Sequence, residues 1–476
     1  MNSFDKDAYP QDSPRILAAC LVGTSIFLER FIYDACRTIL IMYVVQELGI
    51  EEFRDSFRHS PVLVLILSAL SGILVDFLVS TRSILVQGAL LNAIGLGCIA
   101  TGFDVAVIAG VALTLVGSSA AKMGNMTHFG FMLSSRSNHI EGGFSIVWVI
   151  LNVGAFFGGL LMGLLVISGS FTYQTGFWLL TGLASVHAIF LLIISVTGIL
   201  PAARPASSGQ GRRVLSSLLG TFLMIVLAFA IFVFHFWMMQ PSFYFMSESL
   251  VYAVLLMTVV LGFILFAVSP SPSALRRNSV MLLILLLTCV LGATIRLSGD
   301  LARQYVGYFN SMLSVQIQSM LVLLLNLGIG LAFVLRKSTA TKGFSGAGMR
   351  LLIGVGLSTL GVCIYLVFPY VGTIAMIAAV LLGAVGEALY DYLTFATVWR
   401  MTPANRKGTA MGLLMASGGL GYWIADQFTL YNMDIGGKPD CGIWVPGMVM
   451  LAALSMMLVV AIWVMLRNQQ EDAPIS

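Results

Sequence analysis

The sequence predicts an all-α polytopic membrane protein with 14 transmembrane helices. First, 58% of the residues are hydrophobic and only 10% are charged, whereas charged residues make up about a quarter of a soluble globular domain. Second, the apolar runs are about 20 residues long or longer, which is the length of a spanning helix and about twice that of a barrel strand. Third, short polar stretches separate fourteen such runs along the 476 residues.

The predicted helices follow one another with mostly short connections. Their approximate centres are residues 30, 69, 93, 117, 154, 186, 225, 257, 288, 322, 357, 384, 417 and 455. A stretch rich in Pro, Ala, Ser and Gly, 201–213, follows the sixth helix and is typical of a linker. We therefore expect an N-terminal six-helix bundle (1–199), a cytoplasmic linker with an extra two-helix hairpin (200–277), and a C-terminal six-helix bundle (278–476). This 6+2+6 arrangement is typical of transporters built from two repeats, with a substrate site near the membrane midplane.

The distribution of Lys and Arg predicts the orientation. An even number of spans places both termini on one side of the membrane, and seventeen of the 25 Lys and Arg residues fall in loops on that side, against four on the other. Because cytoplasmic loops carry an excess of these residues, we expect both termini in the cytoplasm of a bacterial-type inner (plasma) membrane. In a membrane protein the formal net charge of +4 says little about nucleic acid, and no nucleic-acid partner is expected.

The six cysteines are scattered, and none forms a CxxC pair. A disulfide framework or a metal site is therefore not expected, and neither is a cofactor.

The first predicted helix carries five polar residues, Glu29, Arg30, Tyr33, Asp34 and Arg37. At about 100° per residue they fall within an arc of about 140°, so one face of this helix is polar. Ionisable groups at membrane depth indicate a functional site. The alternative is a purely structural network, in which Arg30 pairs with Asp34 at i,i+4 and Asp34 pairs with Arg37 at i,i+3.

Two further motifs resemble known signatures. The stretch SGILVDFLVSTRS contains Gly72, Asp76 and Arg82, spaced like the cytoplasmic loop signature of the major facilitator superfamily. An acidic residue at a helix end and a basic residue across a tight loop can latch two helices, so Asp76 is either a gating residue or a topological feature. The stretch GFSIVWVILNVGAFFG, 143–158, resembles the fifth-helix signature of the proton-dependent oligopeptide transporter family. We expect its glycines to serve helix packing and Asn152 to provide a polar group at membrane depth.

The first helix resembles the same family. ERFIYDACR, 29–37, matches its first-helix motif, ExxERFxYYG followed by an arginine, with two departures: Ile26 stands where the first glutamate belongs, and Asp34 replaces the second tyrosine. Lys122 has the spacing of the fourth-helix lysine, and Glu387 matches the tenth-helix glutamate in GEALYDYLTFATVWRMTPANRKGTAMG. The resemblance covers nearly the whole chain and implies the major facilitator fold.

The resemblance to this family also implies a dipolar substrate site. The residues matched by Arg37 and Lys122 hold a peptide carboxylate in that family, and the glutamate matched by Glu387 holds the amino terminus. A zwitterion crossing a low-dielectric interior needs such opposite poles, and here they lie in different predicted halves, so a bound substrate would favour closure. Aromatic residues are candidates for the pocket walls, with simple packing as the alternative: Tyr33, Trp148 and Tyr390.

Proton coupling is where the sequence departs from the family. Ile26 removes one carboxylate and leaves Glu29 with Arg30 and Arg37 close by. Glu387 and Asp391 lie at i,i+4 on one helix face, and two carboxyl groups so placed in a low-dielectric interior resist being ionised together. We therefore expect Asp391 or Glu29 to be the acid that exchanges protons.

The leading hypothesis is a monomeric secondary transporter of di- or tripeptides or similar zwitterions, with protons and the lipid bilayer as its other partners. The alternative is a divergent carrier, a facilitator or exporter of a peptide-like metabolite, metallophore or amino-acid derivative without standard proton coupling. A membrane enzyme or sensor is not expected, because the sequence lacks a nucleotide loop, a Ser/His/Asp set at membrane depth and a large extramembrane domain.

Overall fold

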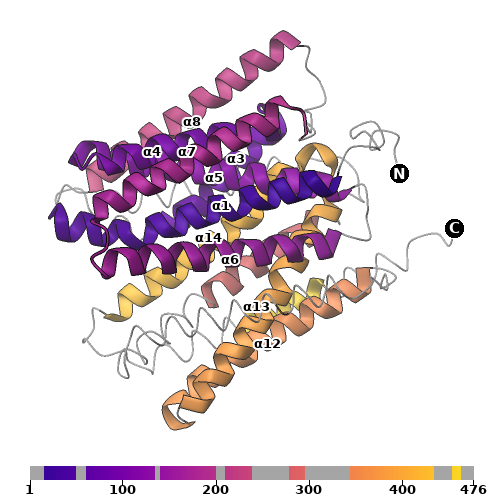
Figure 1. Ribbon diagram of the computed structural model, residues 1–476. Helices are drawn as coiled ribbons and strands as arrows, with labels where there is room; N and C mark the ends of the chain where they lie inside the picture. Colours follow the sequence, from indigo (N-terminus) through magenta and orange to yellow (C-terminus); the bar gives the residue numbers. More distant parts are fainter. Residues whose placement is uncertain are drawn as a thin grey trace. The chain divides into compact units, whose positions relative to one another are not determined.

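The computed structural model describes residues 15–49, 60–134, 140–199, 210–238, 278–294, 328, 344–371, 373–433 and 453–462. These residues are almost entirely helical, and no strand occurs among them (Figure 1). The long helices are α1 (Arg15–Met42), α3 (Ser60–Phe77), α4 (Thr81–Ala100), α5 (Asp104–Ser134), α6 (Ile140–Ile167), α7 (Tyr173–Val196), α8 (Gln210–Met238), α12 (Phe344–Val371), α13 (Thr373–Met401) and α14 (Lys407–Met433). Short helices η2 (Tyr43–Glu47) and η4 (Ala404–Arg406) follow α1 and α13, and two further helical stretches are Asn278–Thr294 and Ala453–Ile462.

The predicted spans agree with these helices. Twelve of the fourteen predicted centres fall inside them, while the centres near residues 257 and 322 lie outside the described residues. The all-α prediction is confirmed, and the count of 14 stays a prediction.

Local sequence explains where several helices begin and end. Ser80 caps α4 by accepting a hydrogen bond from the Ser83 backbone N–H at 3.1 Å, and Thr172 caps α7 in the same way. Gly102 and Gly198 follow α4 and α7 with φ of 78° and 71°, a left-handed conformation that glycine adopts without strain. The caps at Ser80, Gly102 and Thr172 lie in the short connections from α3 to α4, from α4 to α5 and from α6 to α7.

The packing divides the chain into two compact units. Unit 1 consists of 1–137, 150–264 and 402–416, and unit 2 consists of 138–149, 265–401 and 417–476. Helices α6 and α14 therefore each contribute one part to unit 1 and another to unit 2. The predicted division at residues 199 and 277 stays a prediction.

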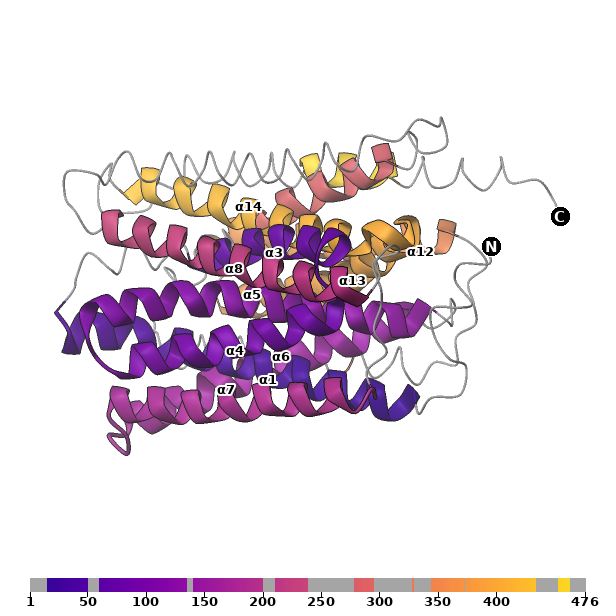
Figure 2. The same cartoon turned by 90° about the horizontal axis from the view of Figure 1, so that it is seen from above.

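Glycine allows close helix packing in unit 1. A Cβ atom on Gly117 of α5 would lie 2.6 Å from the Asn92 backbone nitrogen of α4, and one on Gly110 would lie 2.5 Å from the Gly95 carbonyl oxygen. Small residues of this kind drive helix association in membranes, where apolar burial gives little gain. Helices α4 and α5 accordingly lie side by side (Figures 1 and 2).

Helix α8, the first helix of the predicted extra hairpin, packs on α4. The hydroxyl groups of Ser217 and Ser83 lie 2.8 Å apart, and the Gln87 amide donates to the Ser217 hydroxyl at 3.0 Å. This helix is therefore part of unit 1.

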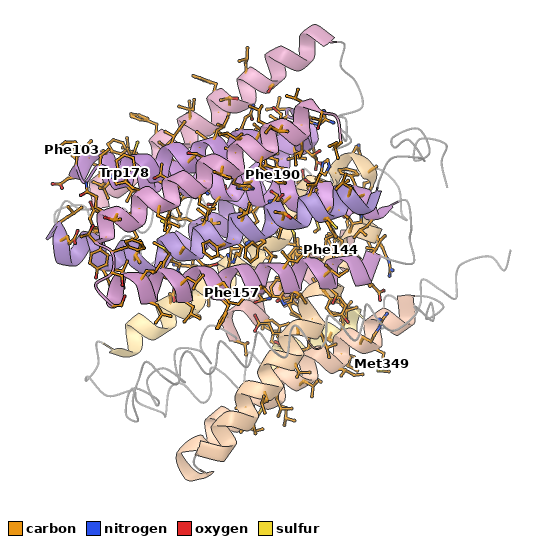
Figure 3. All side chains as sticks on the ribbon, viewed as in Figure 1. Phe103, Phe144, Phe157, Trp178, Phe190 and Met349 are labelled. Carbon is orange, nitrogen blue, oxygen red and sulfur yellow. The ribbon has the colours of Figure 1, made fainter. Side chains whose placement is uncertain are left out.

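Four helices of the described chain are long and apolar enough to span a membrane by length and composition: Thr81–Ala100, Asp104–Leu133, Ile140–Val166 and Tyr173–Val196. Large apolar side chains cover their outer surfaces. Phe103 and Trp178 are 74% and 52% exposed, and Figure 3 shows them at one end of the bundle. Aromatic residues gather at membrane–water boundaries. We therefore expect the end that carries Phe103 and Trp178 to lie near such a boundary.

Candidate functional site

The charged face of α1 lies in the interior of unit 1. Glu29 is only 2% exposed and Tyr33 6%, while Arg30, Asp34 and Arg37 are partly buried. Arg30 Nε lies 2.7 Å from Asp34 Oδ2, so the i,i+4 ion pair of the structural alternative is formed. No ion pair within 4 Å joins Asp34 to Arg37 in the described part of α1. Asp34 therefore neutralises Arg30 and leaves the charge of Arg37 for another partner.

Lys122 of α5 joins this cluster. It is a charged neighbour of Glu29, as are Arg30 and Asp34, and Arg37 is a charged neighbour of Tyr33. Glu29 Oε2 has no hydrogen-bond partner among the described residues. A buried carboxylate oxygen without a partner is costly, so this cluster can bind a proton or a polar ligand with a gain in free energy.

Helix α6 approaches α1 through the predicted packing glycines. A Cβ atom on Gly154 would lie 2.8 Å from the Phe27 carbonyl oxygen, and one on Gly158 would meet the Phe31 carbonyl oxygen. The glycines therefore serve packing, as expected from their spacing. Asn152 precedes Gly154 by two residues, in the part of α6 that belongs to unit 1.

In unit 2, α13 carries Glu387, Tyr390 and Asp391. Glu387 and Asp391 are four residues apart, so their side chains leave α13 on the same face, one helical turn apart. Tyr390 is 2% exposed, and its hydroxyl donates to Thr288 Oγ1 at 2.6 Å. This bond anchors α13 to the helix Asn278–Thr294 and fixes the turn that carries both carboxyl groups. Trp148 belongs to the same unit.

Asp76 is at the C-terminal end of α3, but its partner is not the predicted one. The carboxylate accepts hydrogen bonds from the backbone N–H groups of Gly408 at 2.9 Å and Thr409 at 2.6 Å. Arg82, expected across the loop, instead donates to the Ser195 carbonyl oxygen at 2.9 Å. Asp76 therefore caps the first turn of α14 and joins two predicted halves of the chain, a contact separated by 332 residues.

The sequence did not point to two further polar clusters. In unit 2, Glu141 near the start of α6 forms ion pairs with Arg350 at 2.8 Å and Arg400 at 2.6 Å. In unit 1, Ser25, Asn125 and His187 meet at full burial. Two sequence signals could have pointed to these clusters: His187 in the middle of the apolar helix α7, and Glu141 in the first turn of α6. Neither signal identifies a partner on a distant helix.

Comparisons with known proteins support the predicted resemblance. The dipeptide and tripeptide permease A of Citrobacter koseri is 32% identical over 134 residues, which are 27% of this chain and 26% of the permease. The permease of the same name from Erwinia pyrifoliae is 28% identical over 212 residues, 42% of this chain and 41% of that protein. The matches thus span about a quarter to two fifths of these curated relatives. No family model matches this chain.

The solved structures show the fold. A crystal structure of a POT family transporter in complex with 5-aminolevulinic acid superposes with a TM-score of 0.69 at 15% identity, covering 94% of this chain and 96% of that one. The protein therefore has the fold of a membrane transporter, and the similar proteins are transporters and not enzymes. Together with the permease matches, this confirms the predicted resemblance to the proton-dependent oligopeptide transporter family and the major facilitator fold.

Proposed function

We propose that this multi-pass membrane protein is a secondary active transporter that moves di- or tripeptides, or similar zwitterions, by alternating access with coupling to protons. The observation that carries the proposal is the buried charged cluster of α1 and α5. Asp34 neutralises Arg30, and the charges of Arg37 and Lys122 together exceed that of Glu29 by one, which an anion can neutralise. The names of the permeases that match this chain support the choice of substrate.

In this proposal Arg37 and Lys122 bind the substrate carboxylate, and Glu387 binds the amino group. Binding both termini of a peptide requires opposite charges, while side chains of the substrate contact aromatic and polar groups such as Tyr33, Trp148, Asn152 and Tyr390. Asp391 or Glu29 exchanges the proton. Asp76, Arg30 and Asp34 serve gating or coupling.

The test is counterflow of labelled dialanine into liposomes that contain the full chain, compared with a panel of free amino acids. We expect exchange of dialanine, reduced about 10- to 100-fold in R37Q and E387Q, because each variant loses a charge-assisted hydrogen bond. E47Q, which removes an exposed carboxylate at the end of η2, is the matched control and should behave as wild type. Absence of peptide exchange in the wild type would reject the proposal.

Two observations favour a second candidate, a carrier of an amino-acid derivative or peptide-like metabolite without standard proton coupling. Ile26, which stands in place of a glutamate, is buried with 1% exposure, and the POT structure described above was solved with 5-aminolevulinic acid. Counterflow with 5-aminolevulinic acid in place of dialanine distinguishes the two candidates.

We also propose a monomer of a bacterial-type inner membrane with both termini in the cytoplasm. The excess of Lys and Arg in the loops on that side supports this orientation. A fluorescent protein fused to the C-terminus should fold and fluoresce in the cytoplasm, and a dark, exported fusion would contradict the orientation.

A further inference from the structure

Three polar side chains from α1, α5 and α7 meet in the interior of unit 1. Ser25 Oγ lies 2.9 Å from Asn125 Oδ1 and 3.0 Å from His187 Nε2. Their residues are 0%, 2% and 1% exposed, respectively. Buried polar groups in a membrane bundle are costly unless they are hydrogen-bonded. The contact therefore favours one particular register of the three helices.

The hydrogen bonds define the donor at each position. A serine hydroxyl carries one proton, and Ser25 donates it to the Asn125 carbonyl oxygen. With Ser25 donating to Asn125, Ser25 Oγ accepts a hydrogen bond from His187 when the imidazole carries its hydrogen on Nε2. Asn125 Nδ2 has no hydrogen-bond partner in the described structure.

This network adjoins the charged cluster. Ser25 precedes Glu29 by four residues on α1, and Asn125 follows Lys122 by three on α5, so each network residue lies one helical turn from a charged residue. A shift of α1 along α5 would change both the network and the separation of Glu29 from Lys122. The other charged groups that act on Glu29 are Arg30 and Asp34 of α1. The part of α6 in unit 1 carries no charged residue, and His187 is the one ionisable side chain in the middle of α7.

We propose that His187 is a positioning residue for the charged cluster: through Ser25 and Asn125 it fixes α1 against α5 and thereby holds Glu29 beside Lys122. The relevance of this role to transport rests on the proposed function. The effect of His187 on the position of Glu29 does not. The side chain acts as a neutral hydrogen-bond donor and does not itself touch the substrate.

The test follows the carboxyl group of Glu29 by infrared spectroscopy across a pH range, in the purified full chain without substrate. The Glu29 band is the one that disappears in E29Q. In H187L, which removes the donor, and in S25A, which removes the bridge, we expect the titration midpoint to move by about half a pH unit or more, or the band to change frequency. H187Q keeps an amide N–H donor and should restore the wild-type band.

The two single variants keep the test informative if one of them fails to fold, because S25A is nearly isosteric with the wild type. A Glu29 band in S25A or H187L that matches the wild type at every pH overturns the proposal, since the network is then only structural. A band in H187Q that changes as in H187L also overturns it, because the imidazole and not the hydrogen bond is then required. Dialanine counterflow of the wild type separates this result from the proposed function, since its failure leaves the spectroscopic comparison intact.

Discussion

At the scale of single residues, Asp76 illustrates how one carboxylate can join distant parts of the chain. Two backbone N–H groups at the start of α14 donate to it, and the first N–H groups of a helix otherwise lack partners. We expect D76A to destabilise the protein by about 1–2 kcal/mol, the usual cost of losing a helix cap. Thermal unfolding in detergent measures this loss.

The matched control for this prediction is S80A, which removes the cap of α4, a single bond from the Ser83 N–H. We expect it to cost less than D76A because it leaves one N–H without a partner and removes no charge. Equal losses in both variants would argue against a special role for Asp76.

The same scale shows which contacts sequence can predict. The pairing of Arg30 with Asp34 was predictable because both residues lie on one helix, where four residues make one turn. The partners of Asp76 and Glu141 were not predictable, because they come from helices far away in the sequence and depend on tertiary packing. A single sequence shows that a buried charge needs a partner, but it does not show which one.

At the scale of helices, close packing of α6 on α1 depends on Gly158. A Cβ atom there would meet the Phe31 carbonyl oxygen, which is backbone and cannot move aside alone. We expect G158A to destabilise the protein by about 1–3 kcal/mol, as overpacking does. G182A is the control, because nothing lies within 4 Å of its Cβ position on α7, and it should be neutral or slightly stabilising, since alanine favours a helix. Thermal unfolding of both variants measures the difference. Equal effects of G158A and G182A would show that the close contact at Gly158 does not matter for stability.

The start of α6 is held by a different interaction, the clamp of Arg350 and Arg400 on Glu141. Phe144, which is labelled in Figure 3, lies one turn further along and packs against Phe395 and Trp399 of α13. We expect E141Q to cost about 1–2 kcal/mol at low ionic strength, because it removes the negative charge that contacts both partly exposed arginines. The difference from wild type in thermal unfolding should shrink at high salt, since screening weakens such pairs.

A control for E141Q separates the arginine clamp from the helix dipole. Asp104 occupies the first turn of α5 as Glu141 does that of α6, so D104N removes a comparable interaction with the helix N-terminus. An equal, salt-dependent loss in D104N would show that the arginines contribute nothing beyond the dipole effect.

At the scale of the whole molecule, the lengths of the apolar runs were sufficient to predict an all-helical membrane protein, whereas the major facilitator fold was implied by the resemblance of the motifs. Twelve predicted centres coincide with helices, because a segment in lipid must satisfy its backbone hydrogen bonds internally and therefore forms a helix wherever it is long and apolar. Run lengths carry no information on how helices group. The division of α6 and α14 between two compact units arises from side-chain contacts such as those of Glu141 and Asp76, which only the folded chain reveals.

Proton coupling is a property of the whole transport cycle, and two measurements can isolate it. Counterflow needs substrate exchange but no net proton movement, whereas accumulation driven by a pH gradient needs an acid that binds and releases a proton in each cycle. If Asp391 or Glu29 is that acid, D391N or E29Q should abolish accumulation and retain counterflow, because a neutral amide keeps the shape of the site but cannot ionise. If both variants still accumulate dialanine, neither residue is the exchanging acid. If the wild type exchanges dialanine without accumulating it, the protein is a facilitator, as the loss of a carboxylate at Ile26 would allow.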